Sequence, residues 1–117
     1  MITEEQCTIL DAVIQILLGQ EKRITISFSR NCTSINLPPT RRIAEYLEIP
    51  HYYILPLFAS MERDGLITRV ERVGISTTSK GTMIILTLID ENYQEMAQDI
   101  LPQEMMEVLR ASIPLKT

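Results

Sequence analysis

The side chains able to do chemistry in this sequence are mainly cationic and aromatic, and they gather between positions 41 and 80. Guanidinium and ammonium groups bind phosphate oxygens, while imidazole and tyrosine hydroxyl groups can contact base edges. The candidates are Arg41, Arg42, His51, Tyr52, Tyr53, Arg69, Arg72 and Lys80.

No combination of residues typical of an enzyme accompanies them. His51 is the only histidine, no serine or cysteine nucleophile lies near it in the sequence, and a glycine-rich phosphate loop, an HExxH pattern and an acidic metal cluster are lacking. Cys7 and Cys32 are 25 positions apart without a CxxC pattern, so we expect two reduced structural thiols. The expectation is a protein that is not an enzyme and holds neither metal nor cofactor.

The composition predicts one globular domain over residues 1–117. Hydrophobic residues make up 45% of the chain and charged residues 22%, values near the average for globular proteins, and this length can bury an adequate core. The first apolar run contains Asp11 and Gln15 and has no basic region before it, so it is typical neither of a signal peptide nor of a membrane span. We therefore expect a cytoplasmic protein without a membrane partner.

The charge is unevenly distributed. The formal net charge is −4, with six basic and five acidic residues over 38–89 but two basic and six acidic residues over 90–117. Bulk charge therefore does not favour nucleic acid, and a polyanion would be bound by the middle of the chain.

The elements that must position the candidate residues begin with a helix and a hairpin. Thr3 and Gln6 have the spacing of a capping box, and apolar residues follow at helical spacing until Gly19. Apolar and polar residues then alternate, which predicts a β-hairpin over 23–37 with a turn at 30–31.

Two helices separated by a proline are predicted next. Thr40 can cap a helix that runs to Glu48, and Pro50 ends it. The following helix ends near Gly65. Its apolar stripe at i, i+3, i+4 and i+7 consists of Ile54, Leu57, Phe58 and Met61.

The remaining segments predict a second hairpin and further helices. Two β-rich runs, 66–75 and 82–89, are joined by the small polar residues STTSKG. Asp90 is expected to cap a helical stretch through Ile100, and Pro102 to open a last, methionine-rich helix.

The segment IAEYLEIPHYYILPLFASMERDGLI, residues 43–67, resembles the winged helix-turn-helix of bacterial and archaeal transcription regulators. Ala44 matches the small site where the two helices cross, Ile49 the apolar site in the turn, and Ile54 and Phe58 the inner face of the second helix.

The resemblance implies an α+β winged helix-turn-helix fold with two additions. These are the extra β-hairpin before the motif and an additional C-terminal helix. The expected divisions are a helix-turn-helix at 40–64, a wing at 66–89 and a C-terminal helical segment at 90–111.

The resemblance also implies double-stranded DNA as the partner, with the second helix in the major groove. By position, the residues facing the bases would be His51, Tyr52, Tyr53, Leu55, Pro56 and Ser60. The arginine, asparagine or glutamine that usually reads a base edge is lacking between Ile49 and Ser60, so limited readout by tyrosines and thymine methyl contacts is expected. Inside the helix Pro56 removes a hydrogen bond and costs up to ~3 kcal/mol unless the helix kinks.

Phosphate contacts are implied for the cations. Arg41 and Arg42 would hold the DNA backbone at the start of the first motif helix, and the wing would carry Arg69, Arg72 and Lys80. Two alternatives stay open at this point. The arginines could be solvated or pair with Glu45, and the wing tip could be an ordinary solvated turn.

The function expected is that of a DNA-binding transcription regulator, sequence-specific or weakly specific, which forms a homodimer through its N- and C-terminal helices. The alternative is a winged-helix adaptor, including one for plasmid or phage DNA maintenance, whose Tyr52, Tyr53 and Leu55 surface docks a protein partner. In that case the tyrosines pack on a partner, or on the hairpin at 23–37.

Overall fold

In the computed structural model, which describes residues 2–70 and 74–113, the first helix begins at the predicted capping box. The Thr3 hydroxyl accepts the Gln6 backbone N–H and the Gln6 side-chain oxygen accepts the Thr3 N–H, both at 3.0 Å. This helix, α1 (Glu4–Gln15), continues as a π-helical turn, η1 (Ile16–Glu21), and ends at Lys22 with φ 57°.

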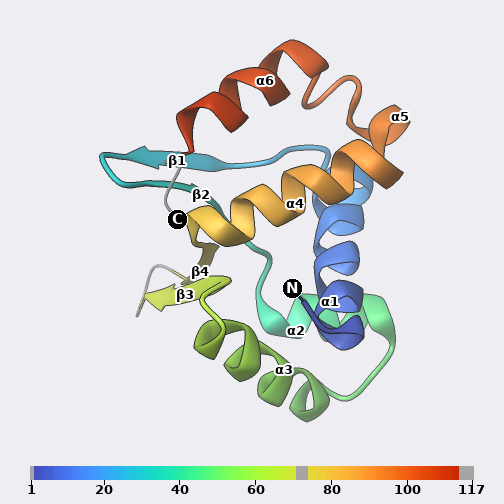
Figure 1. Cartoon of the computed structure of the whole chain (residues 1–117). Coiled ribbons are helices and arrows are strands. Elements are labelled where there is room, and N and C mark those ends of the chain that lie inside the picture. The colour runs from blue at the N-terminus through green and yellow to red at the C-terminus, as the bar shows by residue number, and fades with distance from the viewer. Residues whose placement is uncertain (1, 71–73, 114–117) are drawn as a thin grey trace.

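Hairpins and helices alternate along the rest of the described chain (Figure 1). They are β1 (Ile26–Ser29), β2 (Cys32–Ile35), α2 (Thr40–Leu47), α3 (His51–Arg63), β3 (Ile67–Val70), β4 (Gly74–Thr77), α4 (Ser79–Asn92), α5 (Gln94–Ala97) and α6 (Gln103–Ser112). The predicted α+β class and the predicted hairpin at 23–37 are confirmed. In Figure 1, α3 lies at one end of the molecule and α5 and α6 at the other.

The two hairpins are joined through the chain that follows β2. β1 pairs with β2 in antiparallel register, with Ser29 opposite Cys32, and β3 pairs with β4 from Ile67 opposite Thr77. The Leu37 N–H then donates to the Ile75 carbonyl oxygen at 2.9 Å. This contact places the end of the first hairpin alongside β4, directly before α2.

The strand predicted over 82–89 is wrong, because these residues belong to α4. The Thr78 hydroxyl caps this helix by accepting the Gly81 N–H at 3.1 Å. The buried positions of α4 recur at helical spacing, which lets β-branched residues bury one face of a helix. They include Thr82, Ile85, Leu86 and Ile89. The second hairpin therefore ends at Thr77, and Asp90 lies within α4 instead of capping a later helix.

The core is formed by side chains from most of these elements. Fully buried residues include Ile9, Leu10, Ile35, Ile43, Ile54, Phe58, Leu66 and Ile85. Nearly all apolar side chains of α1 and η1 are buried in this core. Among the described segments, no helix combines the length and the apolar composition needed to cross a bilayer.

Buried threonines link the hairpins to α4. The Thr77 hydroxyl accepts the Ile35 N–H at 2.8 Å and lies 2.6 Å from the Thr82 hydroxyl, and both side chains are 1% exposed. Thr82 donates in turn to the Thr33 carbonyl oxygen. Because buried hydroxyls need partners, this chain fixes how α4 sits on β2 and β4. Thr77 is therefore structural, although its segment was predicted to be an exposed wing tip.

Candidate nucleic-acid interface

The N-terminal ends of α2 and α3 are held together by the side chains of their first residues. Thr40 Oγ1 and His51 Nε2 lie 2.7 Å apart. Thr40 was expected to cap α2, but α2 starts at Thr40 itself and its hydroxyl bonds to His51 instead. The residues before the two helices are Pro39 and Pro50, and neither helix has a side-chain cap. Uncapped first-turn N–H groups carry partial positive charge, so both helices direct positive ends to one place.

Two arginines add full charges at this place. Arg41 is exposed, and Arg42, which is half-buried, donates from Nη2 to Gln20 Oε1 at 2.8 Å. Within the described part of the chain neither guanidinium forms an ion pair, with Glu45 or with any other carboxylate. Cations in the first turn oppose the helix dipole unless an anion lies nearby. The arrangement is therefore suited to binding an anion.

The exposed side of α3 is aromatic and apolar. The exposed fractions of Tyr52, Tyr53 and Leu55 are 66%, 57% and 40%. The two tyrosine rings are tilted by 51° with their centroids 4.8 Å apart. They are therefore available to a partner and are not buried under the hairpin at 23–37.

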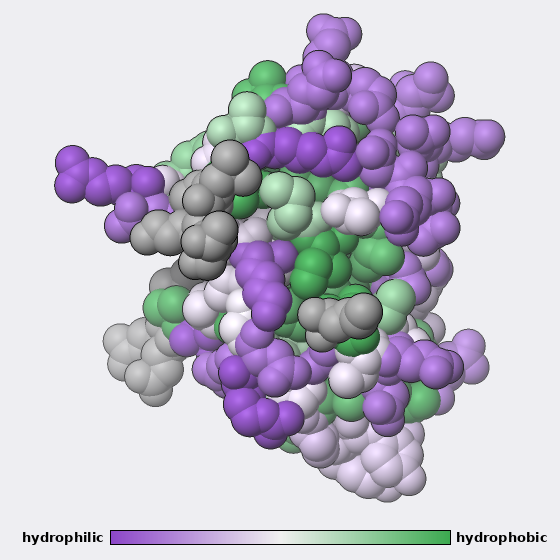
Figure 2. All heavy atoms as spheres, viewed as in Figure 1, coloured by the Kyte–Doolittle hydropathy of each residue, from purple (hydrophilic) through white to green (hydrophobic). Residues whose placement is uncertain are grey.

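Figure 2 shows the heavy atoms as spheres in the view of Figure 1, coloured by hydropathy. Side chains of intermediate hydropathy gather at its lower right, where α3 begins in Figure 1. Strongly hydrophilic side chains lie to the left of them, toward the end of α3.

The other predicted cations lie toward the opposite end of α3, which is about 20 Å long at 1.5 Å per residue. Arg69 Nε lies 3.4 Å from Glu62 Oε1. Lys80, expected on the wing, lies in the first turn of α4, and its Nζ donates to the Asp64 carbonyl oxygen at 3.4 Å. Arg72 lies outside the described residues. The structure thus brings five of the predicted residues together at the starts of α2 and α3, and places Arg69 and Lys80 apart from them.

An open hollow of about 370 Å³ lies between the start of α2 and the second hairpin. It is lined by Asn36, Leu37, Pro39, Thr40, Gly74 and Ile75. The exposed amide of Asn36 was missed by sequence reasoning, as was the Gln20 partner of Arg42. Neither residue belongs to the motif, and only the folded chain brings them to it.

A hydrogen-bonded network fixes α2 against α1. The Tyr46 hydroxyl donates to Gln15 Oε1, Gln15 Nε2 donates to the Tyr93 hydroxyl at 3.0 Å, and that hydroxyl donates to Asp11 Oδ1 at 3.1 Å. Burial raises the pKa of Tyr93, so its hydroxyl keeps its proton and remains a donor. The network connects the C-terminal end of α4 to the helix that carries Arg41 and Arg42.

The cysteines are free thiols. Burial, followed by the negative charge of Asp11, raises the pKa of Cys7, which disfavours the reactive thiolate. Among the residues that the structure describes, no three histidine, cysteine, aspartate or glutamate side chains come together as a metal site.

Comparisons with family models, with curated proteins and with solved structures find no match to this chain. The geometry of the two helix starts is therefore the basis for the function proposed below.

Proposed function

We propose that this protein is a winged helix-turn-helix regulator of transcription that binds double-stranded DNA. The observation that carries the proposal is the meeting of three features at one edge of the molecule. They are two uncapped helix starts, two arginines that have no carboxylate partner among the described residues, and an exposed tyrosine pair.

The connections around α2 and α3 support the fold part of this proposal. The turn between them is short, with Glu48 at φ 57° and the Ile49 N–H donating to the Ala44 carbonyl oxygen at 3.1 Å. A hairpin follows α3 directly, and the chain before α2 pairs with β4. A helix, a tight turn, a helix and a paired hairpin are the parts that a winged helix needs.

In the proposed complex, the start of α2 binds the DNA backbone. Arg41 and the first N–H groups of α2 contact a phosphate, and Arg42 reaches a second phosphate by leaving Gln20. Arg69 exchanges its partly exposed Glu62 partner for phosphate, a small change because exposed ion pairs contribute only about 0–1 kcal/mol.

α3 enters the major groove with its aromatic side. Tyr52 and Tyr53 face the base pairs, and Leu55 offers a methyl-rich surface. Because these groups lack the bidentate donors that read guanine or adenine, sequence preference comes from contact with thymine methyl groups and from tyrosine hydroxyls.

A homodimer is part of the proposal. α1 has little apolar surface left to offer, because its apolar side chains lie in the core. On α6, Met105 and Val108 are 48% and 59% exposed and lie three positions apart on one helix face. We place the dimer contact there rather than on α1.

The experiment that tests the proposal is fluorescence anisotropy of mixed-sequence duplex DNA over a salt series. Wild-type affinity is expected to fall linearly with salt on a log–log scale. Arg41→Ala combined with Arg42→Ala is expected to reduce the slope by about 1.8, since each phosphate contact contributes about 0.9.

The matched control is Arg23→Ala combined with Arg30→Ala, which removes the same charge from two exposed arginines outside α2 and α3. It is expected to leave the slope unchanged. Equal losses for both double variants would indicate bulk electrostatics, and the absence of binding at low salt would reject the proposal.

The exposed tyrosine pair also favours a second candidate function, an adaptor that docks a protein through Tyr52, Tyr53 and Leu55. In that case Tyr52→Ala and Tyr53→Ala release a co-purifying partner, while weak DNA binding stays at its wild-type level. Loss of DNA sequence preference in the same variants supports the regulator instead.

A further inference from the structure

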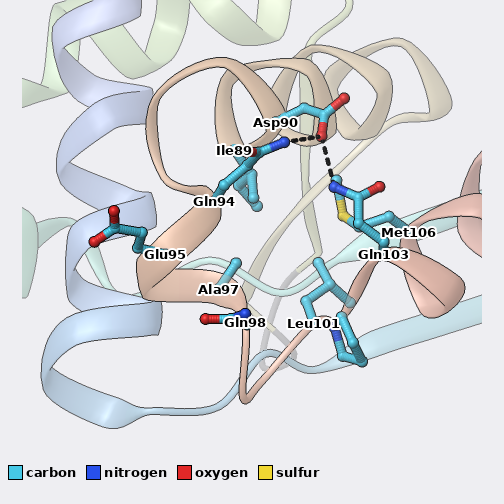
Figure 3. A pocket seen from close by; sticks show the side chains of 10 residues that line it. Ile89, Asp90, Gln94, Glu95, Ala97, Gln98, Leu101, Gln103 and Met106 are labelled. Carbon is cyan, nitrogen blue, oxygen red and sulfur yellow. Dashed lines mark hydrogen bonds between the residues drawn. The ribbon is translucent and has the colours of Figure 1, made fainter.

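A hollow of about 370 Å³ lies between the end of α4, α5 and the start of α6 (Figure 3). This volume falls at the small end of the range for ligand pockets, about 300–1,000 Å³. In Figure 1 these helices lie at the end of the molecule opposite to α3. The hollow is therefore separate from the candidate nucleic-acid interface.

The floor of the hollow is apolar and well buried. It contains Ile89, Ala97, Leu101 and Met106, which are at most 3% exposed. A ligand with a small hydrocarbon body would lie against this floor and bury its own apolar surface there.

The opposite wall is polar and organised around Asp90, with Gln94 and Gln103 beside it in Figure 3. Asp90 Oδ1 accepts from Gln103 Nε2 at 3.0 Å and from Gln94 Nε2 at 3.4 Å, and Oδ2 accepts from Arg110 Nη2 at 2.9 Å. The hydrogen bonds from Gln103 and Arg110 lower the pKa of Asp90, so it is a carboxylate at neutral pH. With their nitrogens on Asp90, the two amides keep their carbonyl oxygens as acceptors for a ligand.

The charge around the hollow is negative. Its acidic lining residues are Asp90, which is paired with Arg110, and Glu95, whose carboxylate points away from Asp90 in Figure 3. Residues 90–113 contain six acidic side chains and one basic one, Arg110. A concave site with one sign of charge attracts ions of the other sign.

α5, which forms one wall, contacts the elements that hold α2. Tyr93, the residue directly before α5, joins the network through Gln15 to Tyr46 of α2. Met96 lies against Gly19, 3.8 Å from the position a β-carbon would take there. The next residue, Gln20, accepts the hydrogen bond from Arg42.

We propose that this hollow binds a small organic cation with an apolar body, and that binding at α5 changes the environment of Arg42 and Tyr46 on α2. The apolar floor holds the hydrocarbon part, and the Asp90 carboxylate together with the amide oxygens of Gln94 and Gln103 holds the ammonium group, to which Glu95 adds an attraction from farther away. The regulatory consequence, altered DNA affinity, rests on the proposed function, whereas binding and its transmission to α2 do not.

The test is an NMR titration of the full ¹⁵N-labelled chain with cyclohexylammonium as the probe. Cyclohexanecarboxylate, an anion with the same hydrocarbon body, is the matched control. The cation is expected to shift the amide signals of residues 89–106 in a saturable way, and the anion is not. Equal shifts with both ions, or cation shifts spread over the whole surface, would overturn the proposal.

Variants locate the site. Ala97→Met fills the hollow and is expected to weaken cation binding at least about tenfold, which corresponds to 1.4 kcal/mol. Glu95→Gln removes an exposed lining charge and is expected to weaken it by about threefold, while Glu107→Gln, the same change outside the hollow, has no effect. Ala97→Met can disturb the core. If it unfolds the protein, the comparison of Glu95→Gln with Glu107→Gln becomes the deciding test. Equal effects of these two variants on cation binding would overturn the site.

The effect of cation binding on α2 is measured from the side-chain NMR signals of Arg42 and Tyr46 in the same titration. Both are expected to shift with the cation in the wild type, and the Tyr46 signal is expected to stop responding in Tyr93→Phe, although the probe still binds. Binding without any shift at Arg42 and Tyr46 would overturn the transmission. Failure of DNA binding would leave these outcomes readable, so the two proposals can fail separately.

Discussion

At the scale of single residues, the candidate interface consists of cationic and aromatic side chains that are exposed to solvent. Arg41 lies at a helix start and forms no ion pair with the described carboxylates, and the exposed rings of Tyr52 and Tyr53 lie against each other at a tilt of 51°. A buried polar residue of α1 shows the contrast. Gln6, 1% exposed, satisfies its amide with Thr3, Ser60 and Asp64. Surface groups of this kind are available for recognition, since the fold does not need them.

Thymine methyl groups test how α3 reads DNA. Replacing thymine by deoxyuridine throughout a bound duplex is expected to weaken wild-type binding by several-fold, because the apolar contact is lost. Tyr53→Ala is expected to reduce this difference, and Arg41→Ala to preserve it at a lower overall affinity. Anisotropy with the paired duplexes measures it, and equal affinities for both duplexes in the wild type would contradict the readout.

Asp90 gives a prediction about pH. Its pKa is lowered in the folded protein by hydrogen bonds from Gln103 and Arg110, so its contribution to stability is present above the unfolded pKa of about 3.9 and is lost as pH falls through the lower folded value. Wild type is therefore expected to be more stable than Asp90→Asn at pH 6, with the gap closing below about pH 4. Urea unfolding at both pH values measures the gap, and one that stayed constant with pH would contradict the assignment.

At the scale of elements, the position of α4 decides the shape of the second hairpin. α4 packs closely on Leu66, the residue before β3, because Gly81 has no side chain. A β-carbon at Gly81 would lie 2.0 Å from the Leu66 carbonyl oxygen, a backbone atom that cannot move aside freely. This contact fixes the end of α3 and the start of the hairpin relative to α4.

Gly81→Ala is therefore expected to destabilise the protein by about 1–3 kcal/mol, the usual cost of overpacking. Gly19→Ala is the matched control, because its β-carbon would meet only Met96 at an ordinary 3.8 Å. The control is expected to be neutral or to stabilise by up to about 1 kcal/mol through the unfolded chain. Chemical denaturation compares the two, and similar stabilities would mean that α4 can move away from Leu66.

At the scale of the whole molecule, positive and negative charge lie toward opposite ends. The cationic helix starts lie toward one end, and the acidic α5 and α6 toward the other (Figure 1). The negative end would be repelled by DNA and so orients the protein on the duplex. The exposed Met105 and Val108 lie on this acidic end, away from the proposed DNA contact.

The dimer contact is tested by Val108→Glu, which is expected to convert a dimer to a monomer by placing a charge in an apolar contact. Thr87→Glu, an exposed position on α4, is the control and is expected to leave the mass unchanged. Light scattering with size-exclusion chromatography reports the mass. Because Glu104 and Glu107 flank the contact, added salt should strengthen the dimer while it weakens DNA binding. A monomeric wild type would reject the dimer.

The sequence by itself determined the features that depend on neighbours within a few positions. The capping box of Thr3 and Gln6 and the hairpin turn at 30–31 follow from local hydrogen bonds, and the structure confirms them. Periodicity predicted the stripe of α3, which is buried at Ile54, Phe58 and Met61 and half-buried at Leu57. The predicted end of α3 near Gly65 is confirmed as well: the helix ends at Arg63, and Gly65 has φ 77°.

Only the tertiary structure decided the rest. β-branched residues over 82–89 favour a strand locally, but the Thr78 cap and the burial of one helical face outweigh that preference. The partners of Thr40, Arg42 and Tyr46 lie 11, 22 and 31 positions away, beyond any local pattern. The cavity beside Asp90 likewise arises where three helices meet, and burial of apolar faces, not propensity, sets how helices meet.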